Sequence, residues 1–362
     1  MSLVLTQVSK VVEGQSHIYP TDLTLERGTM NVLLGPTLSG KTTLMRLMAG
    51  LDVPATGRIL WEGRDVTGMR VQDRKVAMVY QQFINYPSMT VYDNIASPLK
   101  LMGMSPAEMD RKVRAVAELM KLSSMLSRKP LELSGGQQQR CALARALVKD
   151  AGLVLLDEPL ANLDYKLREE LRAEIPRIFE ESGAIFVYAT TEPEEALLLG
   201  GNVATMWEGR VTQFGPTPKV YRAPKDATTA RVFSDPPMNF TTIQKIGDKI
   251  SFGDGQTAAA TGSLAAIKDG TYTAGFRPDH LHLSALGNDG LHFKCRLRVT
   301  EITGSETFVH LDHGNDRWVG LMHGVHHLEF GAPITVWLDA AHVYVFSEHG
   351  ELVAPAAYAA AA

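Results

Sequence analysis

The fold of this chain is decided by the stretch Gly35-Pro36-Thr37-Leu38-Ser39-Gly40-Lys41-Thr42. It follows a short apolar run at residues 31–34 and leads into a segment at residues 42–49 that we expect to be helical. A strand, a glycine-containing turn and a helix form the setting in which backbone N–H groups surround phosphate oxygens. There, Lys41 reaches the terminal phosphates and the Thr42 hydroxyl faces a magnesium ion. Many unrelated nucleotide-binding proteins share this pattern, so alone it predicts a phosphate site without a particular activity.

Three further segments with phosphate chemistry follow along the chain. Gln81 comes after one apolar run, and Asp157 and Glu158 end another. Between them, Leu133-Ser134-Gly135-Gly136-Gln137 opens a predicted helix, whose free N–H groups and dipole can hold a phosphate. Each segment also has a simpler interpretation as a turn, a helix cap or a solvated acidic pair, and Gln82 is an alternative to Gln81. Their occurrence in one order favours the functional interpretation.

Together these segments resemble the ATP-binding subunit of an ATP-binding cassette (ABC) transporter. The resemblance implies ATP and Mg²⁺ as cofactors, with catalytic roles for Glu158, Lys41 and Gln81. It implies magnesium ligation by Thr42, Gln81 and Asp157, and nucleotide contacts from Gly35, Pro36, Thr37, Leu38, Ser39, Gly40, Lys41, Thr42, Thr43 and Asp157. It also implies a dimer in which Asp164 belongs to the D-loop at the interface, and in which the partner's ATP is contacted by the signature residues Leu133, Ser134, Gly135, Gly136 and Gln137.

Three positions depart from the pattern of this family. The family places a switch histidine after the strand that follows the acidic pair, and Thr191 stands there instead. Leu38 replaces a glycine of the phosphate loop, where a side chain restricts the backbone angles that glycine tolerates. Val12 stands where the family has an aromatic residue that stacks on adenine, and Tyr19 could replace it.

All three departures fall on the chain's own nucleotide site, whereas the signature that serves a partner's ATP is intact. This asymmetry predicts an impaired site and a heterodimer with a second ATPase that carries the histidine. The alternative is sequence drift at tolerant positions.

The chain is expected to fold as two domains, because 362 residues are too many for one ordinary core. Residues 1–236 predict an α/β RecA-like P-loop core with an inserted helical subdomain at about 83–150, where Ser105 opens a capping box. Residues 237–355 predict a C-terminal all-β, OB-like domain from short alternating runs. Segments at 236–240 and 275–281 resemble the regulatory domain of maltose-type and glycerol-3-phosphate-type importers. Residues 356–362 predict a loose, alanine-rich tail.

Composition narrows the possible partners. The formal net charge of −4 offers no basic footprint, so we expect no nucleic-acid partner. No apolar run reaches the length of a membrane span. The two cysteines, Cys141 and Cys295, predict ordinary thiols, and the histidines around His326 predict packing or surface positions and not a metal site.

The resemblance implies an ATPase subunit for import of a sugar, polyol or related small solute, peripheral on the cytoplasmic face of the membrane. Its implied partners are two transmembrane permease subunits, an extracytoplasmic solute-binding protein and the second ATPase. One alternative is a largely non-hydrolytic, regulatory ATP-binding subunit of the same kind of complex. Another is a soluble ABC ATPase of translation or DNA repair. That class would need tandem cassettes or a long coiled-coil insertion, and the sequence contains neither.

Overall fold

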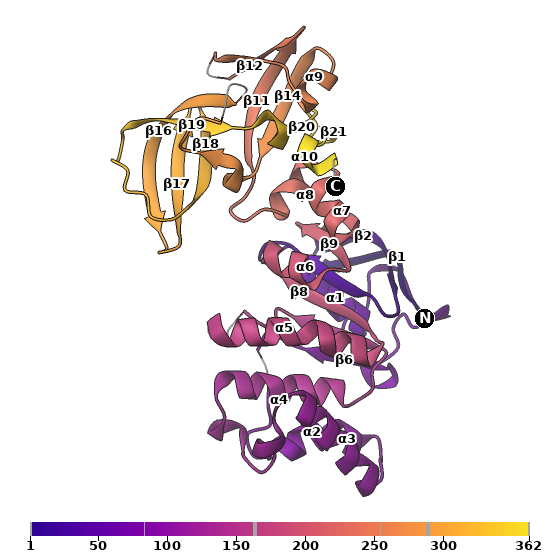
Figure 1. The fold of residues 1–362 in the computed structure, drawn as a ribbon. Coiled ribbons are helices and arrows are strands. Elements are labelled where there is room, and N and C mark those ends of the chain that lie inside the picture. The colour runs from indigo at the N-terminus through magenta and orange to yellow at the C-terminus, as the bar shows by residue number, and fades with distance from the viewer. Residues whose placement is uncertain (1, 83, 162–164, 254, 287–289, 361–362) are drawn as a thin grey trace. The chain divides into compact units, whose positions relative to one another are not determined.

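The computed structural model describes residues 2–82, 84–161, 165–253, 255–286 and 290–360. They form two compact units, Met1–Thr217 and Pro218–Ala362, which are described separately (Figure 1).

A six-stranded sheet forms the centre of the first unit. In spatial order its strands are β10 (Arg210–Pro216), β9 (Asn202–Trp207), β3 (Met30–Leu34), β8 (Ile185–Thr190), β7 (Leu153–Asp157) and β6 (Val76–Val79). All neighbouring strands are parallel except β9 and β10. Every residue of β3, β7 and β8 is buried, as expected for continuous apolar runs inside a parallel sheet. Because parallel strands end at one edge, the phosphate loop, Gln81, Asp157 and Thr191 follow strands that end side by side.

A second, antiparallel sheet and the first helix complete the nucleotide-binding part. The sheet contains β2 (Gln15–Glu26), β1 (Ser2–Val12), β4 (Thr56–Trp61) and β5 (Arg64–Asp65) in that order. Helix α1 (Lys41–Ala49) contributes Leu44, Met45 and Leu47 to a core cluster that also contains side chains from both sheets. This shared core fixes the start of α1 relative to β2.

The remaining helices of this unit belong to two groups. The predicted insertion contains α2 (Val91–Leu101), α3 (Pro106–Leu119) and α4 (Gly135–Leu147), with short 3-10 turns η2 (Ser123–Met125) and η3 (Pro130–Glu132) between the last two. Ser105 caps α3 by accepting a hydrogen bond from the Glu108 N–H at 3.4 Å, as the capping-box pattern predicted. Outside the insertion lie η1 (Val71–Asp73), α5 (Tyr165–Ser182) and α6 (Pro193–Leu199).

The second unit is built mainly from two antiparallel sheets, which confirms the predicted C-terminal all-β domain. One sheet has the order β13 (Thr257–Ala259), β12 (Lys249–Phe252), β11 (Asn239–Ile246), β14 (Gly270–Phe276), β20 (Tyr344–Phe346) and β21 (Leu352–Ala354). The other has the order β15 (Leu281–His282), β19 (Pro333–Leu338), β16 (Leu291–Ile302), β17 (Glu306–His313) and β18 (Asp316–His323). Short helices and turns complete it: α7 (Thr217–Arg222), α8 (Ala227–Val232), α9 (Ser263–Ala266), α10 (Ala357–Ala360), η4 (Pro278–His280) and η5 (Ala340–His342).

Alternating buried residues of these strands meet in one core. Phe276, Phe293 and Trp318 pack edge to face in it, with ring centroids 4.9 and 5.0 Å apart.

The first domain ends earlier than the sequence predicted. The structure divides after Thr217, whereas the composition change suggested 236–237. The reason is Arg277, a buried residue of the second unit, whose guanidinium donates to the carbonyl oxygens of Phe233 at 2.6 Å and Tyr221 at 2.8 Å. It also lies over the Tyr221 ring, 3.7 Å from its centroid. These contacts attach the preceding helices to the β domain.

The alanine-rich end is also not a loose tail as far as it is described. Ala356 is fully buried, and the Tyr358 hydroxyl lies 3.0 Å from that of Tyr344. The Tyr358 ring also packs against His280 and His342. The contacts of Ala356 and Tyr358 therefore hold this segment on the β domain.

Arg277→Met should lower the free energy of unfolding of the second unit by about 2 to 4 kcal/mol, because two buried carbonyl groups lose their donors. Urea unfolding followed by tryptophan fluorescence measures this. Arg298→Met, which removes a half-exposed guanidinium, is the control and should change stability by about 0.5 kcal/mol or less. Equal midpoints for the two variants would contradict this role of Arg277.

Candidate nucleotide-binding site

A cavity of about 620 Å³ opens where the phosphate loop leaves the sheet edge. Its lining brings together most of the phosphate loop, the start of α1, Gln81 and Glu158, as the sequence predicted. Residues that the sequence analysis did not predict for this site also line it, from β2 and from the β9–β10 turn: Ser16, His17, Glu208 and Gly209. Tyr19 lines the cavity, whereas Val12 does not.

Lys41 is the buried cation of the site, with only 4% of its surface exposed. Its ammonium group donates to the carbonyl oxygens of Gly35 at 2.8 Å and Pro36 at 3.1 Å, and pairs with Glu158 Oε1 at 3.2 Å. Helix α1 begins at Lys41, and no side chain caps its N-terminus. Its free N–H groups and the positive end of its dipole therefore favour an anion at the same place as the ammonium group.

The phosphate loop depends on both of its glycines for space. A Cβ atom on Gly35 would lie 2.4 Å from the carbonyl oxygen of Met206. A Cβ atom on Gly40 would lie 2.8 Å from Ile18 Cδ1, and the residue has a φ of 101°. The backbone of the loop thus packs directly on β2, which leaves no room for a side chain there.

Leu38 has the backbone angle that the sequence analysis associated with glycine. Its φ is 68°, in the left-handed region, and its side chain is 95% exposed beside the cavity. A leucine in this conformation is strained by roughly 1 to 2 kcal/mol. Leu38 therefore has a backbone angle that glycine tolerates more readily.

Four oxygen-bearing side chains gather beside Lys41. The Thr42 hydroxyl donates to Asp157 Oδ1 at 3.1 Å, and Gln81 Nε2 donates to Glu158 Oε2 at 3.0 Å. The pKa of the Asp157 carboxyl group is raised, mainly because the group is buried. The nearby charge of Glu158 also raises this pKa, whereas the Thr42 hydrogen bond and the charge of Lys41 lower it. A buried carboxylate beside a threonine hydroxyl is a suitable oxygen set for a magnesium ion.

No group of three or more His, Cys, Asp or Glu side chains that could hold a metal occurs within the described ranges. A magnesium ion at Thr42 and Asp157 would therefore need phosphate oxygens or water as its other ligands.

The signature residues lie at the N-terminus of α4 and do not line this cavity. The Ser134 hydroxyl accepts the N–H of Gln137 at 3.4 Å, and Gln137 Oε1 accepts the N–H of Ser134 at 3.0 Å. This capping box fixes the start of the helix and leaves Ser134 and Gly135 exposed.

Asp164, predicted for the D-loop, lies outside the described residues.

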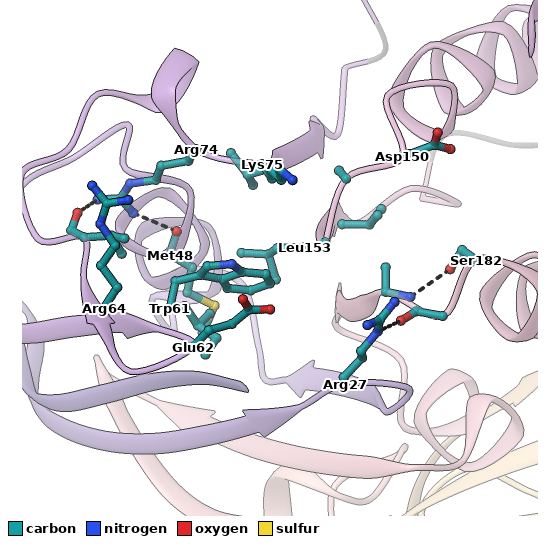
Figure 2. Close-up of a pocket in the computed structure, with 18 of the residues that line it drawn as sticks. Arg27, Met48, Trp61, Glu62, Arg64, Arg74, Lys75, Asp150, Leu153 and Ser182 are labelled. Atoms are coloured by element: carbon teal, nitrogen blue, oxygen red, sulfur yellow. Dashed lines mark hydrogen bonds between the residues drawn. The ribbon is translucent and has the colours of Figure 1, made fainter. Parts of the chain in front are cut away.

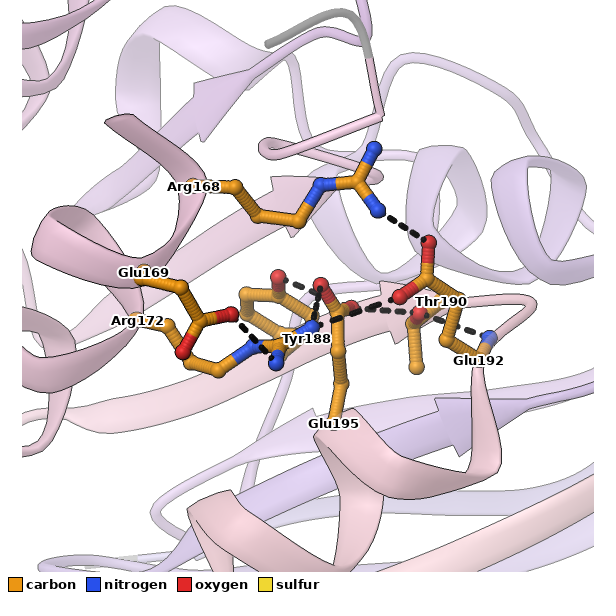
Figure 3. A network of polar contacts seen from close by, with 7 residues as sticks. All are labelled: Arg168, Glu169, Arg172, Tyr188, Thr190, Glu192 and Glu195. Carbon is orange, nitrogen blue, oxygen red and sulfur yellow. Dashed lines mark hydrogen bonds and ion pairs between the residues drawn. The ribbon is translucent and has the colours of Figure 1, made fainter. Parts of the chain in front are cut away.

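Thr191 follows β8, is exposed and does not line the cavity. Its neighbours belong to a polar network from α5, β8 and α6, which the sequence analysis did not predict (Figure 3). The network contains Arg168, Glu169, Arg172, Tyr188, Thr190, Glu192 and Glu195. The i, i+4 spacing of the two arginines was its only signal in the sequence.

Glu195 is the buried centre of this network. It accepts hydrogen bonds from the hydroxyls of Thr190 at 2.5 Å and Tyr188 at 3.1 Å. Burial raises the pKa of Glu195, the Thr190 hydrogen bond lowers it, and the charge of Glu192 raises it. Arg172 lies 3.3 Å from Glu192 and 3.7 Å from Glu195. Because these contacts surround residues 190–193, the network holds the segment that contains Thr191.

These features define the class: a P-loop nucleotide-binding domain with an acidic pair at a neighbouring strand end. Comparison with known families supports this assignment. The family "ABC transporter" matches residues 18–161, and the family "TOBE domain" matches residues 274–346.

The chain is also similar to whole proteins. It is 35% identical to the trehalose/maltose import ATP-binding protein MalK of Thermococcus litoralis over 95% of this chain and 97% of that protein. It is 34% identical to the sn-glycerol-3-phosphate import ATP-binding protein UgpC of Vibrio vulnificus (96% and 93%), and 33% identical to the oligosaccharides import ATP-binding protein MsmX of Bacillus subtilis (89% and 90%). Among solved structures, the dimeric ABC transporter cassette MJ0796 matches with a TM-score of 0.54 and 26% identity, covering 59% of this chain and 98% of that one.

The chain therefore belongs to the family of ABC-transporter ATP-binding subunits that carry a C-terminal TOBE domain.

Leu38→Gly should raise the stability of the first unit by about 1 kcal/mol, because glycine adopts the left-handed backbone without strain. Thermal unfolding should show a midpoint about 2 to 4 °C higher. Thr37→Gly is the matched control, since Thr37 does not have a positive φ, and it should destabilise the unit slightly. A lower midpoint for Leu38→Gly would show that the leucine side chain makes a contact that outweighs the strain.

Proposed function

We propose that this chain binds and hydrolyses ATP to energise import of a sugar, polyol or related small solute through an ABC transporter. The observation that carries the proposal is the cluster of Lys41, Thr42, Gln81, Asp157 and Glu158 at one end of a parallel sheet. Its groups supply a phosphate-binding cation, oxygen ligands for a divalent metal and a carboxylate base.

The geometry assigns different tasks to these side chains. Lys41 and the N–H groups at the start of α1 would hold the terminal phosphates, where preorganised donors stabilise developing charge. Mg²⁺, when bound at Thr42 and Asp157, would neutralise charge on the phosphate oxygens. Once Lys41 pairs with phosphate, Glu158 is released to accept a proton from the attacking water, a role that contributes roughly a hundredfold to ten-thousandfold in rate. Gln81, hydrogen-bonded to Glu158, would orient that carboxylate.

The class of solute is supported by the relatives, whose names specify import of trehalose/maltose, sn-glycerol-3-phosphate and oligosaccharides. Such a role requires two transmembrane permease subunits and an extracytoplasmic solute-binding protein as partners, and places this chain on the cytoplasmic face of the membrane. No helix within the described part of the chain is long and apolar enough to span a bilayer.

A groove of about 330 Å³ in the first unit is our candidate for the permease contact. Tyr80, Ile84, Tyr86 and Leu101 line it, and Ile84 and Leu101 are 61% and 90% exposed. The groove is lined by β6 and by Tyr80, the residue before Gln81, so a permease segment in this groove would contact the chain next to the ATP site. Exposed apolar side chains concentrated in one groove are typical of an interaction site.

We further propose that the chain works as a heterodimer with a second ATPase that carries the switch histidine. Thr191 lacks the ring nitrogen that would contact the terminal phosphate, and Leu38 strains the phosphate loop. By contrast, the N-terminus of the signature helix is capped, and Ser134 and Gly135 are exposed outside the chain's own cavity. A largely non-hydrolytic regulatory role remains the second candidate, favoured by Thr191 and opposed by the intact pair of Lys41 and Glu158.

The two kinds of site mutation should differ in the complex purified through a tag on this chain. Ser134→Arg, which blocks the partner's ATP, should nearly abolish ATP hydrolysis, whereas Glu158→Gln, which disables the chain's own site, should reduce it less. Ser105→Arg, the same change at the N-cap of α3, is the matched control for lost capping and should leave activity unchanged.

The complex purified through the tag on this chain also tests whether a second ATPase is its partner. Mass spectrometry should identify a second ATPase chain, and the isolated chain should hydrolyse ATP at least about a hundredfold more slowly than the complex. A complex that contains this chain as its only ATPase, with equal complete loss from both mutations, would rule out the heterodimer while leaving the importer function intact.

Met89→Cys, beside the groove, should form crosslinks to a permease subunit in membranes, because the side chain is 40% exposed next to the proposed contact. The natural cysteines Cys141 and Cys295 are buried and should not react. Arg111→Cys on the exposed face of α3 is the control and should give no permease crosslink. Crosslinks obtained only from cysteines placed in the second unit would exclude this docking groove.

A further inference from the structure

A second cavity, of about 600 Å³, lies in the first unit at the opposite ends of the strands that carry the nucleotide site (Figure 2). It lies beside the beginnings of β6 and β7, whose far ends carry Gln81 and Asp157, and it shares no lining residue with the nucleotide cavity. Its volume is in the range of cavities that hold small organic molecules.

The charges around this cavity do not balance locally. Arg27, Arg64, Arg74 and Lys75 line it, together with three carboxylates. Two of those carboxylates are already paired with cations that do not line the cavity: Asp73 with Arg70, and Asp150 with Lys112. The third is Glu62, so one carboxylate without an ion pair among the described residues faces the three cations Arg64, Arg74 and Lys75. The cavity therefore favours an anion.

Arg74 shows the imbalance most clearly. Its guanidinium donates to the carbonyl oxygens of Met69 at 3.1 Å, Met48 at 3.0 Å and Val66, and it has no ion pair among the described residues. A partly buried cation held only by neutral carbonyl groups is not compensated in charge. Burial lowers the pKa of Arg74 for the same reason. Neither Arg64 nor Lys75 has an ion pair within the described ranges.

Trp61 provides a flat surface in the same cavity. Figure 2 shows it between Arg64 and Arg74 on one side and Arg27 and Asp150 on the other. The indole lies so close to Gly152 that a Cβ there would be 2.7 Å from Trp61 Cζ2. Its ring nitrogen has no hydrogen-bond partner among the described residues, and the ring is only partly buried. A ring with one fixed edge beside excess cations is suited to a flat, negatively charged ligand.

We propose that this cavity binds a small planar anion, an aromatic or heteroaromatic ring with one carboxylate or phosphate group. The ring would lie against Trp61, and the anionic group would be held by Arg64 and Lys75, with Arg74 adding fixed positive charge. This site is separate from ATP binding and does not rest on the importer function.

Isothermal titration calorimetry of the full chain tests the proposal with matched probes. Naphthoate and naphthyl phosphate distinguish the two anionic groups, while naphthalenemethanol and naphthylmethylammonium have the same ring without negative charge. At least one anion should bind, and the neutral and cationic probes should bind at least about tenfold more weakly. Saturating ATP with Mg²⁺ should not displace the anion.

Variants locate the site. The double variant Arg64→Ala, Lys75→Ala should weaken anion binding at least about tenfold, and Trp61→Leu about fivefold or more. Arg58→Ala, on the same strand as Trp61 but outside the cavity, is the matched control and should change affinity less than about twofold. Unaltered circular dichroism of the double variant, whose side chains are exposed, would show that it is folded.

Four results would overturn the proposal. They are absence of anion binding up to about 5 mM, equal affinity for the neutral probe, unchanged affinity in the double variant, and displacement of the anion by ATP. The last result would place the anion in the nucleotide cavity and would leave the ATPase assignment unaffected.

Discussion

Parallel pairing of β6, β7, β8 and β3 is the constraint on which the first unit depends. Asp157 pairs with Ala189, and Leu34 pairs with Thr190, at the carboxyl ends of these strands. The ladder continues past the strands, since Glu158 N–H donates to Ala189 at 3.0 Å and Gly35 N–H donates to Thr190 at 3.2 Å. The acidic pair and the phosphate loop are thus held by main-chain hydrogen bonds to the same strand, β8. Their spacing is a property of the sheet rather than of side-chain packing.

Charge organises the site once the sheet has placed it. Lys41 is buried and forms an ion pair with Glu158. Phosphate would compete with that pair, which links substrate binding to release of the carboxylate base. On the other side of β8, Glu195 and Arg172 secure the segment that follows the strand. Both faces of β8 therefore carry groups that restrain the catalytic edge.

The second unit is stabilised differently, by antiparallel sheets around an aromatic core. Its antiparallel strands alternate between buried and exposed residues, and its core is aromatic around Trp318. Arg277 extends this core to residues that precede the β domain, because a buried guanidinium with five N–H groups can satisfy carbonyls from two segments at once. The position of the domain boundary is a consequence of these contacts.

The sequence by itself determined the elements whose chemistry is local to the chain. A glycine-containing turn between an apolar strand and a helix specifies the phosphate loop, and the N-cap residues Ser105 and Ser134 specify where their helices begin. Alternation with a period of two specified the C-terminal β domain. The α/β core, the β domain and the grouping of Lys41 with Glu158 could be predicted because each depends on short-range hydrogen-bond geometry or on the common edge of parallel strands.

Only the tertiary structure decided what long-range contacts create. His17 and Glu208 line the nucleotide cavity because β2 and the β9–β10 turn pack on the phosphate loop, and no local pattern encodes that approach. No local pattern encodes the network around Glu195, the contact of Tyr358 with Tyr344, or the group of cations around Trp61. In each case side chains distant in sequence are brought together by burial of apolar surface, which fixes positions without leaving a periodic signal in the chain.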